Sequence, residues 1–135
     1  MSRKARIAVI GAGLMGHGLA QVFALGGHDV AITDSFAANL DTVKARISAN
    51  LADLGDDANA VNRVTPVGDL AAAVRDADFV VEAVLEDLPL KQTLFGNIEK
   101  HVRPDTILAS NTSVIPIKKI MEGLTHREHS PGTHW

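Results

Sequence analysis

The stretch Ile7-Ala8-Val9-Ile10-Gly11-Ala12-Gly13-Leu14-Met15-Gly16 decides how the rest of this sequence is interpreted. Its first four residues are continuously apolar, which predicts a strand buried on both faces of a parallel sheet. Its last six residues follow the pattern G-x-G-x-x-G, and apolar side chains then recur at helical spacing over residues 14–25. The glycine pattern alone arises often by chance, so its meaning depends on this strand and this helix.

Between a buried strand and an amphipathic helix, each glycine has its own physical role. Gly11 allows a tight turn, Gly13 lets the backbone approach a pyrophosphate, and Gly16 lets the helix pack closely. The helix start at Leu14 and Met15 offers N–H groups and the positive end of the helix dipole to a phosphate. The alternative is a purely structural strand–helix connection. The context favours a dinucleotide site formed by these five residues.

Asp34 lies 18 residues after Gly16, at the end of a second predicted strand over residues 30–33. An acid at this place accepts hydrogen bonds from the adenosine ribose hydroxyls of a bound dinucleotide. Its charge would repel a 2′-phosphate, and the next three residues include no arginine to receive one, so NAD is predicted rather than NADP. A helix N-cap aspartate is the alternative, and the two roles can coexist.

The remaining sequence alternates predicted strands and helices. Further strands are expected at 63–67, 79–84 and 106–110, and helices at 36–54, at 69–74, from Pro89 onward and at 115–124. This alternation predicts one α/β domain over residues 1–135, a Rossmann-type, doubly wound, mainly parallel sheet with helices on both faces. The apolar positions expected to face inward are Met15, Leu19, Val22 and Phe23 in the first helix and Phe36, Leu40, Val43, Ile47, Leu51 and Leu54 in the second.

Composition narrows the function classes. A formal charge of −3 gives no indication of a nucleic-acid or membrane-surface partner, and the absence of cysteine excludes disulfides, thiolate metal sites and cysteine nucleophiles. The apolar run near the N-terminus is shorter than the roughly 7–15 residues of a signal-peptide core. No run approaches the roughly 18 apolar residues that span a bilayer. A cytoplasmic protein is therefore expected.

Polar residues follow two of the predicted strands, where ligands of such sheets bind. Without further context, Glu86 and Lys91 would be interpreted as a solvated helix start, and the Ser-Asn-Thr-Ser segment as a polar loop or cap. The candidates are Glu82, Glu86, Asp87 and Lys91 after the fourth strand, and Ser110, Asn111, Thr112 and Ser113 after the fifth.

Three separate segments carry a family resemblance. The glycine turn, the stretch from Asp78 to Lys91 (DFVVEAVLEDLPLK) and residues 107–113 (ILASNTS) together resemble the NAD-binding domain of the 3-hydroxyacyl-CoA dehydrogenases. The terminal Gly132-Thr-His-Trp135 is similar to the start of that family's histidine motif. The resemblance covers nearly the whole chain, with its segments in the right order.

The resemblance implies an enzyme that reversibly oxidises an L-3-hydroxyacyl-CoA with NAD. It implies that Ser113 hydrogen-bonds the substrate's 3-oxygen and that His134 is the catalytic histidine. Glu86 and Lys91 would line the nicotinamide end of the cofactor, with Asn111 beside them. An imidazole, whose ordinary pKa is about 6.5, is suited to take the hydroxyl proton near neutral pH.

The family's carboxylate that orients the histidine, and its helical C-terminal domain, would lie beyond residue 135. These 135 residues are therefore expected to bind NAD and to be weakly active or inactive alone. They should expose an apolar surface where that domain would dock, with any homodimer belonging to the full-length enzyme.

Two other functions remain open. Gly-Thr-His-Trp, in place of Gly-Met-His-Phe, also resembles relatives acting on small free hydroxy acids such as carnitine or gulonate. A non-catalytic NAD-binding module is the third hypothesis. Lys44 is expected either to meet a CoA phosphate or, by preference, to be a solvated surface lysine.

Overall fold

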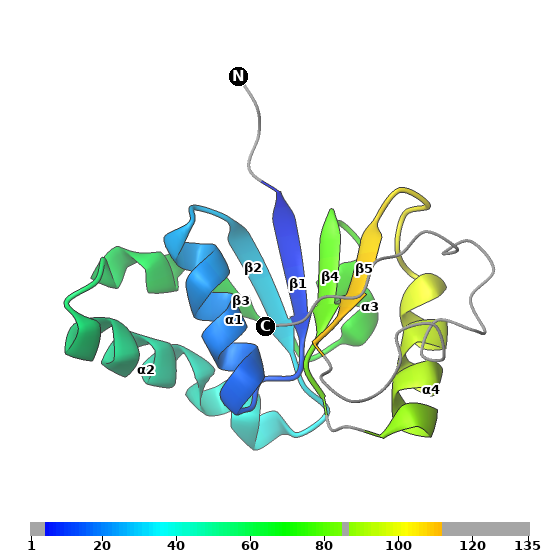
Figure 1. Ribbon diagram of the computed structural model, residues 1–135, viewed down its shortest axis with the longest axis horizontal. Helices are drawn as coiled ribbons and strands as arrows, with labels where there is room; N and C mark the ends of the chain where they lie inside the picture. Colours follow the sequence, from blue (N-terminus) through cyan, green and yellow to red (C-terminus); the bar gives the residue numbers. More distant parts are fainter. Residues whose placement is uncertain (1–4, 85–86, 112–135) are drawn as a thin grey trace.

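The computed structural model describes residues 5–84 and 87–111 and shows a parallel sheet covered by helices (Figure 1). The strands are β1 (Arg6–Ile10), β2 (Asp29–Thr33), β3 (Val64–Pro66), β4 (Phe79–Glu82) and β5 (Ile107–Ser110). The helices are α1 (Leu14–Leu25), α2 (Ala37–Leu54), α3 (Leu70–Val74) and α4 (Leu88–Glu99), with a 3₁₀ helix, η1 (Ala58–Arg63). The helix predicted at 115–124 lies outside the described residues.

The strand order is β3-β2-β1-β4-β5, and every neighbouring pair is parallel. The chain moves outward from β1 to β3 and then returns to place β4 on the other side of β1. In register, Val9 on β1 lies between Ile32 on β2 and Val81 on β4. This order puts a topological switch point between β1 and β4, the place where ligands bind in open α/β sheets.

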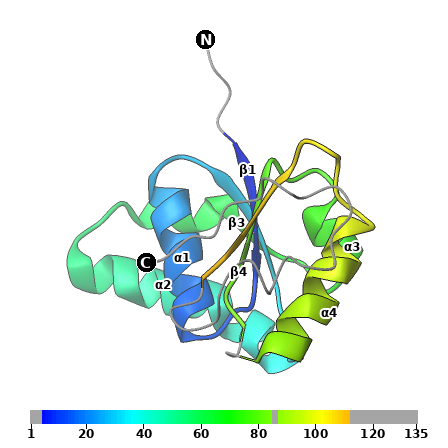
Figure 2. The same ribbon diagram turned by 45° about the vertical axis from the view of Figure 1, so that its right-hand side comes forward.

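Strand β1 is buried on both faces, as its apolar run predicts. Ile7 and Val9 belong to one core with α1 and α2, whereas Ala8 and Ile10 belong to a second core with α3 and α4. Figure 2 shows α1 and α2 on one side of the sheet and α3 and α4 on the other. The predicted α/β, doubly wound fold is confirmed.

Several predicted boundaries differ from the structure. Helix α1 begins and ends as predicted, but β4 ends at Glu82, because the N–H of Val84 donates to the Glu82 side chain at 2.8 Å. The third strand begins only at Val64, since the preceding residues form η1. Asp69 occupies the N-cap position of α3, but its side chain makes no capping hydrogen bond.

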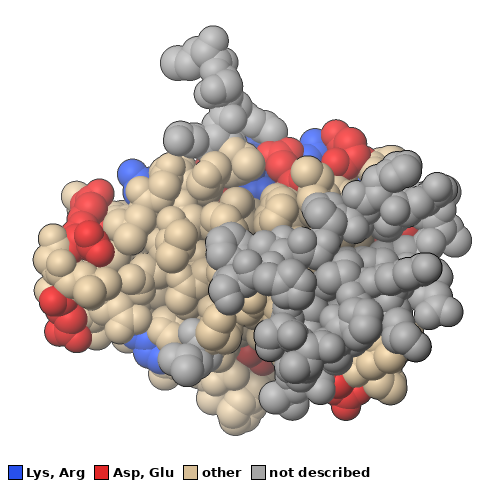
Figure 3. All heavy atoms as spheres, in the orientation of Figure 1, with Lys and Arg blue, Asp and Glu red and all other residues tan. Residues whose placement is uncertain are grey.

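The buried face of α1 was only partly predicted. Met15 and Val22 are 50% and 58% exposed, whereas Ala20 and Ala24 are wholly buried. Small side chains face inward because α1 lies close against the sheet, which leaves larger apolar groups on its outer side. Figure 3 shows the face of the molecule on which α1 lies, and its described part is largely uncharged, in agreement with these exposed apolar side chains.

The ends of α2 also depart from the predicted face. Val43, Ile47 and Leu51 are buried, but Phe36 and Leu54 are 64% and 67% exposed. A helix of 18 residues is roughly 27 Å long, which exceeds the roughly 17 Å of a five-residue strand. The two end positions therefore extend past the sheet.

Charged groups are few on the face shown in Figure 3, and acidic ones gather near the end of α2, where Asp53, Asp56 and Asp57 are exposed. Lys44 on α2 is exposed as well, which agrees with the preferred interpretation as a surface lysine.

Among the residues that the structure describes, no helix has the length and apolar character needed to cross a membrane.

Candidate dinucleotide-binding site

A cleft of about 680 Å³ opens at the carboxyl ends of β1, β2 and β4. It lies at the topological switch point, and its volume falls within the range of small-molecule sites. Predicted site residues Gly11, Gly13 and Asp34 line it. The other lining residues are Ile10, Thr33, Ser35, Phe36, Asn39, Gly68, Leu70, Ala83, Val84, Leu90 and Leu94.

The three motif glycines meet different surroundings. Gly11 has a φ of 108°, and a Cβ there would lie 2.8 Å from the carbonyl oxygen of Ala83. A Cβ on Gly16 would overlap the carbonyl of Gly11, whereas one on Gly13 would meet nothing within 4 Å. Gly11 and Gly16 therefore permit the turn itself, and Gly13 leaves open space beside the cleft.

The N–H groups of the turn divide into two sets. Gly11 donates to the carbonyl oxygen of Thr33 at 2.7 Å, and Ala12 donates to Asp34 Oδ2 at 2.7 Å. Across residues 5–84 and 87–111, the structure gives no acceptor for the N–H groups of Gly13, Leu14 and Met15. These are the unsatisfied donors of a helix N-terminus, which suit the oxygens of a pyrophosphate.

His17, on the first turn of α1, holds one peptide unit of this turn. Its Nδ1 donates to the carbonyl oxygen of Gly13 at 2.8 Å, and its Nε2 lies 3.2 Å from the side-chain amide of Asn50. Because a carbonyl oxygen only accepts, the ring hydrogen is on Nδ1, and Nε2 accepts from Asn50. The Gly13 carbonyl and the Leu14 N–H share one planar peptide, so His17 also orients that N–H.

Asp34 is half-buried in the wall of the cleft and accepts three hydrogen bonds. Its Oδ1 accepts from the N–H of Phe36 at 2.8 Å, and its Oδ2 accepts from Ala12 and from the Asn39 side chain at 2.7 and 3.1 Å. A carboxylate has about four lone-pair positions, so one remains for a ligand hydroxyl. The N-cap interpretation is wrong, because Phe36 occupies the N-cap position of α2.

Lys91 on α4 is completely buried, so its interpretation as part of a solvated helix start is wrong. Its Nζ lies 2.5 Å from Glu82 Oε2 and donates to the carbonyl oxygen of Val84 at 3.4 Å. The hydroxyl of Ser110 donates to the other oxygen of Glu82, which is itself wholly buried. This buried cluster joins α4 to β4 and β5 behind the cleft, and Lys91 does not line the cleft.

Of the other predicted site residues, the structure describes Asn111 but not Glu86, Ser113 or His134. Asn111 is half-buried and extends the pairing of β5, because its N–H donates to the carbonyl oxygen of Glu82 at 2.8 Å. Glu86, Ser113 and His134 lie outside the described residues. The sequence did not predict Asn39, Arg46 or His17 as site residues. For His17 a signal was present, because it lies four residues after Gly13, which is about one helical turn. For Asn39 and Arg46 the sequence offered no signal.

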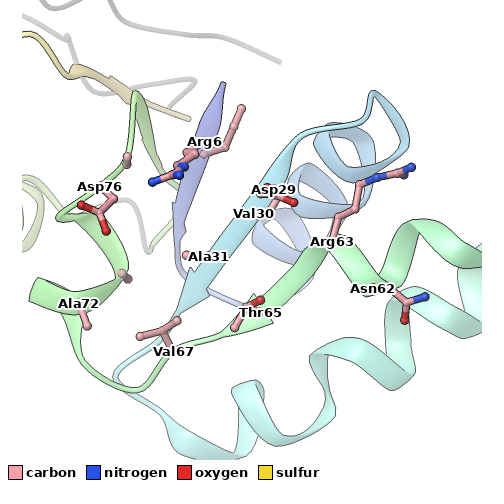
Figure 4. A pocket seen from close by; sticks show the side chains of 13 residues that line it. Arg6, Asp29, Val30, Ala31, Asn62, Arg63, Thr65, Val67, Ala72 and Asp76 are labelled. Atoms are coloured by element: carbon pink, nitrogen blue, oxygen red, sulfur yellow. The ribbon is translucent and has the colours of Figure 1, made fainter. Parts of the chain in front are cut away.

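A second, shallower hollow of about 260 Å³ lies at the amino ends of β1 and β2, where Arg6, Asp29 and Asp76 are found (Figure 4). Arg63 contributes to its wall but directs its guanidinium away, donating to the carbonyl oxygen of Ala24 at 2.9 Å. Within the described ranges, no three His, Asp or Glu side chains are grouped to hold a metal ion. The cleft at the opposite end is therefore the candidate site.

Comparisons with known proteins agree with this arrangement. The sequence profile described as "3-hydroxyacyl-CoA dehydrogenase, NAD binding domain" matches residues 6–135. The Homo sapiens protein named hydroxyacyl-coenzyme A dehydrogenase, mitochondrial, is 34% identical over 96% of this chain and 45% of its own. A Mesorhizobium japonicum 5-formyl-3-hydroxy-2-methylpyridine 4-carboxylate 5-dehydrogenase is 33% identical over 96% of this chain and 43% of its own.

The crystal structure of Escherichia coli 3-hydroxybutyryl-CoA dehydrogenase matches 99% of this chain and 30% of that chain, with a TM-score of 0.91 at 33% identity. The present chain spans about half the length of the curated relatives it matches. The profile match, which covers nearly all of the chain, confirms the predicted family and its cofactor, NAD. The chain belongs to the 3-hydroxyacyl-CoA dehydrogenase family, as one of its NAD-binding domains.

Proposed function

We propose that the cleft binds NAD and that this chain is the nucleotide-binding part of an enzyme oxidising L-3-hydroxyacyl-CoA to 3-oxoacyl-CoA. The observation that carries the proposal is that Gly13 and the Asp34 carboxylate line one 680 Å³ cleft at the switch point, and that the N–H of Gly13 has no acceptor among the described residues. Relatives named as hydroxyacyl-coenzyme A and 3-hydroxybutyryl-CoA dehydrogenases support the substrate class.

The residues present fit NAD by their chemistry. The N–H groups of Gly13, Leu14 and Met15, which have no acceptor in the described part of the chain, would bind the pyrophosphate, while Gly11 and Gly16 permit the tight turn that precedes them. The remaining lone pair of Asp34 would accept a hydrogen bond from an adenosine ribose hydroxyl. Phe36 and Leu90, both exposed and both lining the cleft, offer apolar surface to a base.

The reacting end is assigned from the family resemblance. When bound, NAD supplies the acceptor for the hydride that leaves the substrate's 3-carbon. His134 is proposed to take the proton of the 3-hydroxyl, and Ser113 to hydrogen-bond its oxygen. Glu86 and Asn111 are proposed to line the nicotinamide end. Lys91 would support that end from beneath, because its ammonium is buried against Glu82.

The biological setting is also a proposal. A 3-hydroxyacyl-CoA substrate fits fatty-acid β-oxidation, and a homodimer would involve parts of the enzyme beyond this chain. We propose the cytoplasm as the compartment, with no nucleic-acid or membrane partner. Because the human relative is named mitochondrial, fractionation of the source cells is the direct test of this location.

A second candidate substrate is a small free hydroxy acid. The Mesorhizobium relative, named as a dehydrogenase of 5-formyl-3-hydroxy-2-methylpyridine 4-carboxylate, a small acid without CoA, is as similar to this chain as the enzymes named for acyl-CoA substrates. Turnover of acetoacetyl-CoA by the gene's full-length product would favour the first candidate, and turnover of carnitine or gulonate the second. NAD binding without any turnover would favour a non-catalytic module. The 135 residues alone should turn over acetoacetyl-CoA slowly.

Cofactor choice is tested by calorimetric titration with NAD and NADP. We expect wild type to bind NAD at least tenfold more tightly, because the Asp34 carboxylate repels a 2′-phosphate; tenfold is about 1.4 kcal/mol. Asp34→Ala should lose most of this preference. Asp29→Ala, at the opposite end of β2, is the matched control and should keep it. Equal affinity of wild type for both cofactors would remove the role given to Asp34, and no NAD binding would overturn the proposal.

A further inference from the structure

Arg46, in the middle of α2, reaches back to the glycine turn across 34 residues of sequence. Its Nη2 donates to the carbonyl oxygens of Ala12 and Asn39, at 2.6 and 2.7 Å. Its Nε donates to the hydroxyl of Thr42 at 3.2 Å, which holds the side chain along the helix. The guanidinium therefore joins the glycine turn to the first turn of α2.

The two residues that Arg46 holds also donate to Asp34. The N–H of Ala12 and the side-chain amide of Asn39 both bond Asp34 Oδ2, at 2.7 and 3.1 Å. Arg46, Ala12, Asp34 and Asn39 thus form a closed ring of hydrogen bonds. The ring contains a cation and a carboxylate, and hydrogen bonds to charged groups are stronger than neutral ones.

The ring controls the direction of groups that face the cleft. The Ala12 carbonyl and the Gly13 N–H belong to the same planar peptide, so a carbonyl held by Arg46 also orients that N–H. The Gly13 N–H is one of the three donors without an acceptor in the described part of the chain. At the other side of the ring, two donors fix the Asp34 carboxylate, which lines the cleft.

We propose that Arg46 is a positioning residue for the dinucleotide, aligning the Gly13 N–H for the pyrophosphate and the Asp34 carboxylate for the adenosine ribose. Arg46 does not line the cleft and acts through its neighbours. The inference rests on the proposed function, because the ligand concerned is NAD in the same cleft. Because one ring orients both the Gly13 N–H and the Asp34 carboxylate, loss of Arg46 should weaken the pyrophosphate and ribose contacts together.

The test compares Arg46→Met with Arg63→Met. Arg63 is the matched control, since its guanidinium also donates to a backbone carbonyl, that of Ala24, but at the far end of α1. Binding of NADH and of ADP-ribose to the 135-residue chain is measured by calorimetry, together with the melting temperature. Amide hydrogen exchange at Ala12 is followed by NMR, with the core residue Val80 as the reference.

We expect Arg46→Met to bind NADH and ADP-ribose about tenfold more weakly, in line with the loss of charged hydrogen bonds, and to exchange the Ala12 amide faster. Arg63→Met should keep wild-type affinity, even if both variants melt at lower temperature. If Arg46→Met binds both ligands as tightly as Arg63→Met, Arg46 is only structural and the inference is overturned. Wild type that fails to bind NADH would instead refute the proposed function.

Arg46→Lys provides a second variant should Arg46→Met not fold. The lysine keeps a cationic nitrogen donor, but its side chain is shorter. Its ammonium therefore cannot keep both hydrogen bonds that Nη2 makes to the carbonyl oxygens of Ala12 and Asn39 at their present lengths. Weaker NADH binding than that of Arg63→Met supports the positioning role. Affinity equal to that of Arg63→Met overturns it.

Discussion

At the scale of single residues, burial decides what a charged side chain does. Lys91 looks in the sequence like a solvated residue at a helix start, and its family position suggests contact with the cofactor. In the structure its ammonium is completely buried between Glu82 and the carbonyl of Val84. No local pattern predicts this, because Glu82 is nine positions away and on another element.

Removal of Lys91 should be costly for stability. Lys91→Met would leave the buried Glu82 carboxylate without its cation, so we expect a loss of about 3–5 kcal/mol in the free energy of unfolding. Urea denaturation measures this. Glu82→Gln combined with Lys91→Met should recover much of the loss, and Lys44→Met, on the exposed side of α2, should change little. A Lys91→Met variant as stable as Lys44→Met would contradict the role of this pair.

The glycines of α1 provide a sharper residue-scale contrast. A Cβ at Gly16 would overlap the Gly11 carbonyl, whereas one at Gly18 would meet nothing within 4 Å. Gly16→Ala should therefore distort the turn and abolish NAD binding. Gly18→Ala should bind NAD normally and gain about 0.5–1 kcal/mol, because alanine favours the helix. Calorimetry and denaturation check the pair, and normal NAD affinity of Gly16→Ala would refute the close-packing argument.

At the scale of elements, an aspartate at the start of a helix does not always cap it. Asp87 and Asp69 both occupy N-cap positions, of α4 and α3. Only Asp87 accepts a capping hydrogen bond, from the N–H of Leu90 at 3.1 Å. Pro89 in the first turn of α4 agrees with the prediction, because its missing N–H costs nothing there.

The two aspartates make an element-scale prediction. Asp87→Ala should reduce the free energy of unfolding by about 1 kcal/mol, the usual cost of losing a side-chain cap. Asp69→Ala removes the same carboxyl from a helix that does not use it as a cap, so its effect should be near zero. Parallel urea titrations measure both variants. Equal losses would show that general charge near the helix start, rather than the Leu90 bond, is responsible.

At the scale of the whole molecule, the strand order creates the site. The glycine turn follows β1, Asp34 follows β2, and Ala83 and Val84 follow β4, and all of them line one cleft because these three strands are neighbours. The order β3-β2-β1-β4-β5 leaves this cleft at the switch point between β1 and β4. The outer side of α1 exposes Met15, Val22 and Leu25, whereas the expected docking surface for a second domain stays a prediction.

The fold, the NAD site and the family could be predicted from the sequence alone. The alternation of apolar runs and amphipathic segments predicted the fold, the glycine turn with Asp34 predicted an NAD site, and three motifs predicted the family. These features are local, since turn geometry, helix starts and strand burial depend on residues near one another in the chain. The roles of Glu86, Ser113 and His134 stay predictions.

Only the tertiary structure decided which polar groups are paired. It brought Arg46 to Ala12, Asn50 to His17 and Lys91 to Glu82, from different elements in each case. It also left the N–H groups of Gly13, Leu14 and Met15 without acceptors in the described residues. The physical reason is that burial and hydrogen-bond pairing depend on how elements pack, whereas the spacing of residues records only what each element does by itself.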